Sequence, residues 1–108
     1  MKLLSKEILK KLPPLYASEQ KQLENNEIKV PLKLFNAMGG QTWYITEYNP
    51  EDQLGYGWCD LGFGEAELGY VSIAELIECA KTNRRFMLER DLYWDSNTML
   101  ADVMAGKN

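Results

Sequence analysis

The chain has 108 residues, of which 45 % are hydrophobic and 26 % charged, as is ordinary for one soluble globular domain. We therefore expect a single domain over residues 1–108. No apolar run approaches the roughly 20 residues of a membrane-spanning helix, and the first residues lack the pattern of a secretory signal, so we expect a cytoplasmic protein without a membrane partner. The chain has no histidine and only two isolated cysteines. We therefore expect no metal site and no cofactor.

The charges are distributed unevenly along the chain. Residues 1–33 carry a net charge of +3, residues 34–80 a net charge of −8 without any Lys or Arg, and residues 81–108 a net charge of +1. The central stretch must therefore find cations elsewhere in the chain or on another molecule.

The first third of the chain is expected to be helical and then irregular. Ser5 is a good N-cap, because its hydroxyl can accept from an unpaired first-turn N–H, and Pro13 disfavours helical geometry at the residue before it. A short polar helix is expected from Ser18 to Leu23.

Strands are expected next. Residues 28–35 alternate between apolar and polar, and Pro31 cannot donate a ladder hydrogen bond, so this strand is expected at a sheet edge. Residues 41–48 hold the densest run of β-branched and aromatic residues and are expected to form a central strand. Alternation places Trp43, Ile45 and Glu47 on one face of that strand, which we take as the buried face.

The rest of the chain adds a third strand and two helices. The third strand is expected over residues 54–61. Ser72 and Glu75 form a capping box for a helix, residues 86–94 are expected to be extended, and Asp95 or Ser96 is expected to cap a last helix. The pattern predicts an α+β fold, an antiparallel meander sheet of three to four strands with helices packed mainly on one face.

Two sets of residues are candidates for binding. Carboxylates at strand ends and turns can gather at one edge of a meander and form an acidic face, and we include Glu47, Glu51, Asp52, Asp60, Glu65 and Glu67. Aromatic side chains are enriched in protein interfaces. Candidates are Tyr44, Tyr48, Tyr56, Trp58 and Tyr70, of which we include Tyr48, Tyr56 and Trp58. Proteins that stack on nucleic-acid bases surround their aromatics with Lys and Arg, which this stretch lacks, so we expect a basic protein partner rather than direct nucleic-acid binding.

Two further groups have mainly structural interpretations. Arg90, between Glu89 and Asp91, is expected to form an ion pair that neutralises part of the acidic middle. Cys59 has no histidine to activate it as a nucleophile. The spacing of the carboxylates matches no metal-loop or glycosidase motif, so we assign no catalytic and no metal-binding residue.

Four short motifs, taken together, resemble a family of small bacterial, plasmid and phage proteins that is classed only as a domain of unknown function. They are Leu-Pro-Pro-Leu-Tyr at residues 12–16, Thr-Trp-Tyr with Thr-Glu and Pro-Glu-Asp within residues 42–52, Glu-Leu-Gly-Tyr-Val-Ser at residues 67–72 with Glu-Leu at 75–76, and Glu-Arg-Asp-Leu-Tyr-Trp at residues 89–94. The similarity runs from about Leu4 to Trp94, which leaves the last helix outside it. The resemblance implies a cytosolic protein carried on mobile elements near transfer and antirestriction genes, and it brings no catalytic residues.

Two functions follow as hypotheses. The first is a non-enzymatic binding protein of a mobile genetic element, which presents an acidic face with aromatics to a basic protein partner, host defence proteins included. The alternative is a small carboxylate-based or metal-dependent hydrolase. The first requires carboxylates spread over a surface, and the second requires three carboxylates that converge in a pocket.

Overall fold

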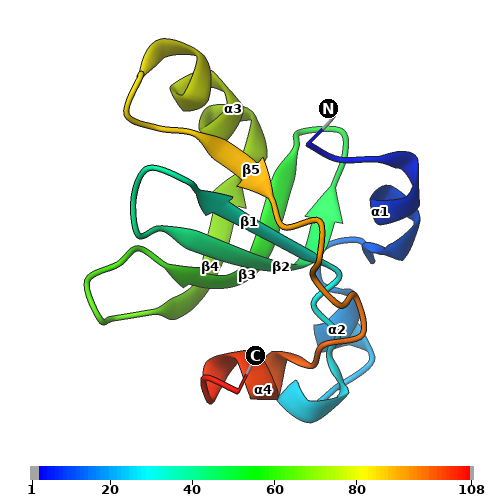
Figure 1. The fold of residues 1–108 in the computed structure, drawn as a ribbon. Coiled ribbons are helices and arrows are strands. Elements are labelled where there is room, and N and C mark those ends of the chain that lie inside the picture. Colours follow the sequence, from blue (N-terminus) through cyan, green and yellow to red (C-terminus); the bar gives the residue numbers. More distant parts are fainter. Residues whose placement is uncertain (1–2, 108) are drawn as a thin grey trace.

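The computed structural model describes residues 3–107 and shows a five-stranded antiparallel sheet with short helices around it (Figure 1). The strands are β1 (Leu32–Asn36), β2 (Thr42–Asn49), β3 (Leu54–Asp60), β4 (Glu67–Ser72) and β5 (Leu88–Arg90), in the spatial order β4-β3-β2-β1-β5. The helices are α1 (Lys6–Lys11), α2 (Ala17–Gln20), the 3₁₀ turn η1 (Asn25–Glu27), α3 (Ile73–Thr82) and α4 (Leu100–Met104). The predicted α+β class is confirmed. The expected three to four strands become five, and the meander covers only β1 to β4.

The expected edge position of the first strand is wrong. Pro31 lies just before β1, and β1 pairs with β2 on one side and with β5 on the other. Pro31 therefore interrupts no ladder. The edge strands are β5, which is the only extended part of residues 86–94, and β4, which the sequence pattern did not indicate as a strand.

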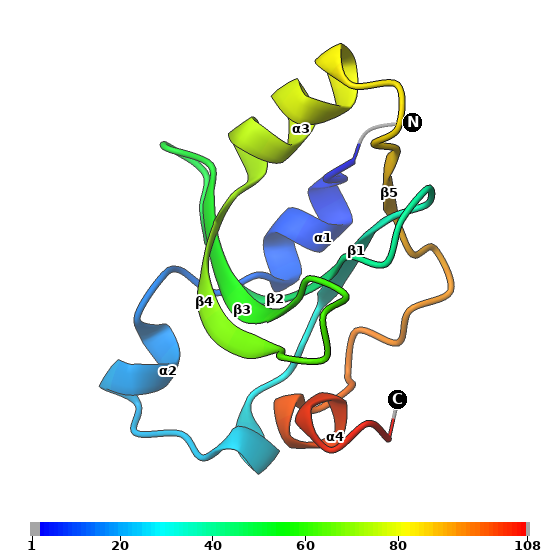
Figure 2. The same cartoon turned by 90° about the vertical axis from the view of Figure 1, so that its left-hand side faces the viewer.

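Helices cover both faces of the sheet, not mainly one (Figure 2). On the first face, α1 and α3 enclose a core that includes Leu34, Trp43, Ile45 and Ile73. On the second face, α4 and the segment before β1 enclose a smaller core around Val30, Leu100 and Val103, against which Tyr44 and Trp58 pack. The burial predicted for Trp43 and Ile45 is confirmed, with exposed fractions of 5 % and 0 %.

A β-bulge in β2 changes which side chains face which core. Ile45 pairs with Gly57 and Glu47 pairs with Tyr56, so Thr46 is the extra residue. An extra residue reverses the alternation beyond it, because side chains point to opposite faces with a period of two residues. Tyr48 consequently joins Trp43 and Ile45 in the first core. Glu47 does not share their face, contrary to the prediction from alternation.

The helix caps follow local sequence at two of the helices. Ser5 accepts from the Ile8 N–H and Ser72 accepts from the Glu75 N–H, as predicted. The last helix differs, because α4 begins at Leu100 rather than after Asp95 or Ser96. The Leu100 N–H donates to the Ile28 carbonyl at 2.7 Å, so a contact with a distant segment sets this start. Within residues 3–107, none of the helices has the length and apolar composition that crossing a membrane requires.

Candidate functional site

The six predicted acidic residues do not form one face. Glu51 and Asp52 lie in the β2–β3 turn, whereas Asp60, Glu65 and Glu67 lie where β3 ends and β4 begins. Successive turns of an antiparallel meander are at opposite ends of the sheet, and the seven residues of β3 place them roughly 20 Å apart. The expected gathering of these carboxylates at one edge is therefore corrected to two separate groups, with Glu47 in neither.

Glu47 is buried, with an exposed fraction of 5 %, and its carboxylate is used inside the fold. Its Oε1 accepts from the Tyr16 N–H at 3.0 Å and its Oε2 from the Ser18 N–H at 2.8 Å. These two N–H groups belong to the start of α2, where Tyr16 has φ 72° and offers no side-chain cap. The β2 carboxylate thus replaces a local cap and fixes the segment that carries Tyr16.

Glu47→Ala is expected to lower the free energy of unfolding by about 2 kcal/mol, since it removes the acceptor of two charge-assisted hydrogen bonds. The matched control is Glu51→Ala, because Glu51 is an exposed carboxylate of the same stretch, and a change within about 0.5 kcal/mol is expected there. Urea unfolding measures both. Equal midpoint shifts in the two variants would contradict the capping role of Glu47.

The aromatic residues also separate once the fold is known. Tyr48 is buried in the first core and cannot serve as a surface aromatic, which corrects that prediction. Trp58 is half-buried against the second core. Tyr56 is half-buried and contacts Tyr70 edge to face at 5.0 Å between ring centroids, and Tyr70 contacts Tyr16 at 6.4 Å. Tyr16, Tyr56 and Tyr70 make up what we call the tyrosine cluster.

The tyrosine cluster reaches solvent beside the carboxylate of Glu19. Tyr16 and Tyr70 are 50 % and 54 % exposed. A hydrogen bond with the Tyr16 hydroxyl is the main cause that raises the pKa of Tyr70 to about 12, and the charge of Glu19 adds to it. Tyr70 is therefore neutral at physiological pH, and the carboxylate of Glu19 lies close enough to act on it. Tyr70 was among the aromatic residues considered for an interface, whereas Tyr16 was not, although it lies in the motif at residues 12–16.

The raised pKa of Tyr48 is expected to make the fold less stable in alkali. Burial, and then the charge of Asp52, raises the pKa of Tyr48 above its ordinary value of 10.0. The unfolded chain then loses this proton first, so the native state binds more protons and the free energy of unfolding falls as pH rises above about 10. Urea unfolding between about pH 9 and pH 11 measures the slope. Tyr48→Phe is expected to make it shallower than in the wild type, and an unchanged slope would contradict this.

The outer edge of β4 is open. Figure 2 views the sheet from its end, with β4 as the outermost strand on one side. No segment within residues 3–107 forms a backbone hydrogen bond with residues 67–71 from outside the sheet. Proteins usually protect an edge strand with Lys, Pro, a bulge or a very short strand. The other edge strand, β5, has three residues, but β4 has six without Lys or Pro, and it exposes Leu68 as well as Tyr70.

A hollow of about 400 Å³ lies on the second face beside β4. Its walls include Glu19 of α2, Tyr56 of β3 and Leu68 of β4. The open backbone edge, the tyrosine cluster and this hollow are adjacent. Glu65 precedes β4 and Glu67 is its first residue, and both side chains are exposed. This combination, which we call the β4 edge site, is the candidate functional site.

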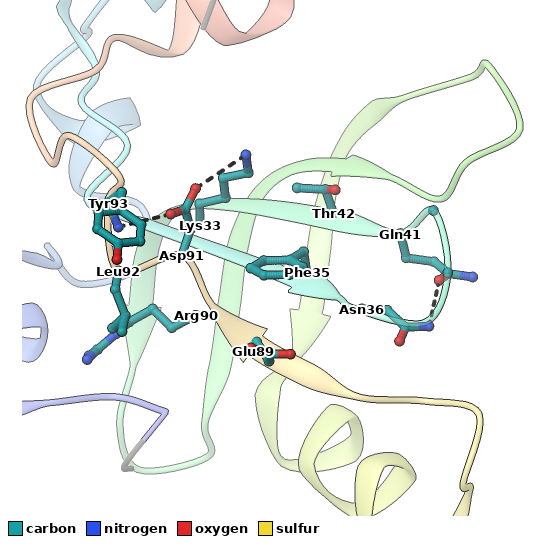
Figure 3. A pocket seen from close by; sticks show the side chains of 12 residues that line it. Lys33, Phe35, Asn36, Gln41, Thr42, Glu89, Arg90, Asp91, Leu92 and Tyr93 are labelled. Carbon is teal, nitrogen blue, oxygen red and sulfur yellow. Dashed lines mark hydrogen bonds and ion pairs between the residues drawn. The ribbon is translucent and has the colours of Figure 1, made fainter.

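A larger hollow, of about 490 Å³, lies between the β1–β2 turn and the segment after β5 (Figure 3). Two of its charged residues are paired with each other, because Lys33 Nζ lies 3.5 Å from Asp91 Oδ2, and Asp91 Oδ1 also accepts from the Tyr93 N–H at 3.0 Å. The ammonium of Lys33 also lies 5.2 Å from the ring of Trp94, a cation–π distance. These contacts give Lys33 and Asp91 a structural role at this hollow.

The ion pair predicted for Arg90 is wrong. Lys33 is the cation that neutralises Asp91, and Figure 3 shows Arg90 pointing away from that pair. Among the described residues, Nη1 of Arg90 is buried without a hydrogen-bond partner. Alternation along β5 explains this, because Arg90 pairs with Leu34, whose side chain points into the first core.

Comparison with known proteins adds the family. A model of DUF2958, described as a protein of unknown function, matches residues 3–106. The chain belongs to the DUF2958 family. Searches of curated proteins and of solved structures found no match. The resemblance to an unknown-function family is confirmed, and the match extends beyond Trp94, so the last helix belongs to the DUF2958 domain and does not lie outside it.

Two further features concern chemistry, the Cys59 thiol and metal binding. Burial, and then the charge of Glu67, raises the pKa of the Cys59 thiol above 9.0, which leaves little thiolate at neutral pH. Residues 3–107 include no group of three or more His, Cys, Asp or Glu side chains placed to hold a metal ion.

Proposed function

We propose that this DUF2958 protein is a non-enzymatic, cytoplasmic binding protein that docks a basic protein partner at the β4 edge site. The observation that carries the proposal is the unprotected edge of β4, where exposed Leu68 and Tyr70 adjoin the tyrosine cluster. Apolar side chains on an open edge strand promote aggregation unless another chain covers them. A partner that pairs with this edge would bury the same apolar side chains, and their burial would contribute to binding affinity.

The charges around β4 support a basic partner. Glu65 and Glu67 are exposed, and their carboxylates make no hydrogen bond or ion pair with residues 3–107. Glu19 adds a further negative charge near Tyr70. Charge complementarity accelerates encounter and selects against acidic partners. The proposed acidic surface thus contains fewer of the six carboxylates first considered, because Glu47, Glu51 and Asp52 lie elsewhere.

The biological setting in this proposal comes from the resemblance drawn on the sequence motifs. In this setting a mobile genetic element carries the protein, and the basic partner of the protein belongs to a host defence system. A small domain that occupies a cationic surface of such a partner would act by blocking that surface. This setting predicts that the partner loses nucleic-acid binding when the DUF2958 protein is bound.

The alternative of a carboxylate-based hydrolase is less well supported. It requires three carboxylates that converge in a pocket, and the six predicted ones are divided between a buried cap and two opposite ends of the sheet. No observation favours it over binding.

The test is partner capture with charge variants. Glu65→Gln combined with Glu67→Gln is expected to reduce capture of the basic partner several-fold at low salt, and the difference should shrink at about 1 M salt, where charges are screened within about 3 Å. The control is Glu51→Gln combined with Asp52→Asn, which removes the same charge at the opposite end of the sheet. Equal loss of capture in both variants, or in neither, would overturn the proposal.

A further inference from the structure

The backbone groups that β4 presents to its open edge can be identified. The Tyr56 carbonyl accepts from the Thr46 hydroxyl at 3.1 Å, so the backbone of Tyr56 faces β2. Because N–H and C=O groups alternate sides along an antiparallel strand, the neighbours Gly55, Gly57 and Cys59 face β4. The Sγ of Cys59 lies 3.8 Å from the Gly57 carbonyl and 3.9 Å from the Gly69 carbonyl, which fits this assignment.

The hydrogen-bonded pairs between β3 and β4 are therefore those of Glu67, Gly69 and Val71. The backbone N–H and C=O groups of Leu68 and Tyr70 then point away from β3, toward the open edge. These are four backbone groups spaced as in a β-ladder, on a strand whose outer side no other segment of residues 3–107 covers.

The side chains beside these groups indicate what a docked strand should carry. On the first face, a Cβ built at Gly69 would have no heavy atom within 4 Å, so there is room for a long side chain from a neighbouring strand. Glu67 lies two residues away on that same face. On the second face, Leu68 borders the hollow that Glu19 lines, and Tyr70 packs against Tyr56, which lines the same hollow. A Lys or Arg side chain fits both settings, with its apolar stem over Gly69 or Leu68 and its charge near a carboxylate.

We propose that the basic partner binds by strand addition, with an extended segment that pairs with Leu68 and Tyr70 and places a Lys or Arg side chain over Gly69, beside Glu67. The inference rests on the proposed function and specifies how the partner is recognised. Main-chain hydrogen bonds provide affinity in this mode, and the alternate side chains provide specificity.

The test uses the chain of 108 residues labelled with ¹⁵N and a synthetic peptide in which lysine alternates with valine and both ends are blocked. Binding is expected to slow hydrogen exchange at the amides of Leu68 and Tyr70 while leaving those of Gly69 and Val71 unchanged. A peptide with the same sequence but N-methylated at alternate amides keeps the charge and loses the donors. It is expected to bind about tenfold or more weakly.

Three outcomes would overturn strand addition. Equal affinity for the N-methylated peptide would indicate electrostatic adhesion without a strand, and the proposed basic partner would still stand. Perturbed amides confined to the hollow beside β5 would place the peptide elsewhere. Protection of Leu68 and Tyr70 that depends on protein concentration without peptide would show that a second copy occupies the edge. Failure of the partner capture described above, in contrast, would remove the proposed function itself.

Discussion

Trp43→Ala is expected to lower the free energy of unfolding by about 3–5 kcal/mol, the range for removing a buried large aromatic side chain. Trp43 is 5 % exposed in the first core, where its ring packs against Phe86 with 6.1 Å between centroids. A domain of this size is stable by about 5–15 kcal/mol, so the variant should be partly unfolded at physiological temperature. Urea unfolding followed by circular dichroism measures the loss.

Tyr93→Ala is the matched control for this prediction, because Tyr93 is a large aromatic residue that is 97 % exposed. A change within about 0.5 kcal/mol is expected. If Trp43→Ala unfolds at the same urea concentration as Tyr93→Ala, the first core does not depend on the central strand in the way described.

Gly57→Ala is expected to destabilise the protein by about 3 kcal/mol or more, an effect at the upper end of those seen for overpacking. A Cβ built at Gly57 would lie 1.8 Å from the backbone carbonyl oxygen of Tyr44 on the neighbouring strand. A backbone atom in the middle of a sheet cannot move away without breaking the β2–β3 ladder next to the bulge. The loss should appear in urea unfolding and as faster hydrogen exchange in β2 and β3.

Gly69 provides the control, since it pairs directly with Gly57 across β3 and β4. A Cβ at Gly69 would have no heavy atom within 4 Å, so Gly69→Ala should change stability by no more than about 0.5 kcal/mol. Similar losses of stability in Gly57→Ala and Gly69→Ala would show that the close approach of the Tyr44 carbonyl does not restrict the side chain at position 57.

The sequence pattern predicts the faces of the central strand correctly as far as Ile45 and wrongly after it. Alternation correctly places Trp43 and Ile45 in the core, and it fails at Glu47 and Tyr48 because of the bulge at Thr46. The bulge lies beside the close approach of Gly57 from another strand, and no local pattern in β2 reveals either feature. The two mistakes share this cause, since the bulge turns Glu47 to α2 and Tyr48 to the core.

The candidate site was harder to predict than the core. Glu51 and Glu65 are near each other in sequence, but an antiparallel meander puts their turns at opposite ends. β4 was not indicated as a strand, because exposed Leu68 and Tyr70 on one side and Gly69 on the other give no buried alternation. The contact between Tyr16 and Tyr70 joins the segment before α2 to β4, and only the folded chain brings them together.

The most direct test of the β4 edge site is photo-cross-linking in cells that hold the natural partner. A photoreactive phenylalanine analogue is placed at Leu68, on β4, or at Tyr93, an exposed position near the opposite edge strand. The β4 edge site predicts a cross-linked protein from position 68, reduced when Glu65 and Glu67 are changed to Gln, and none from position 93. A cross-link from position 93 alone would contradict it and place the partner at the β1–β5 side of the sheet.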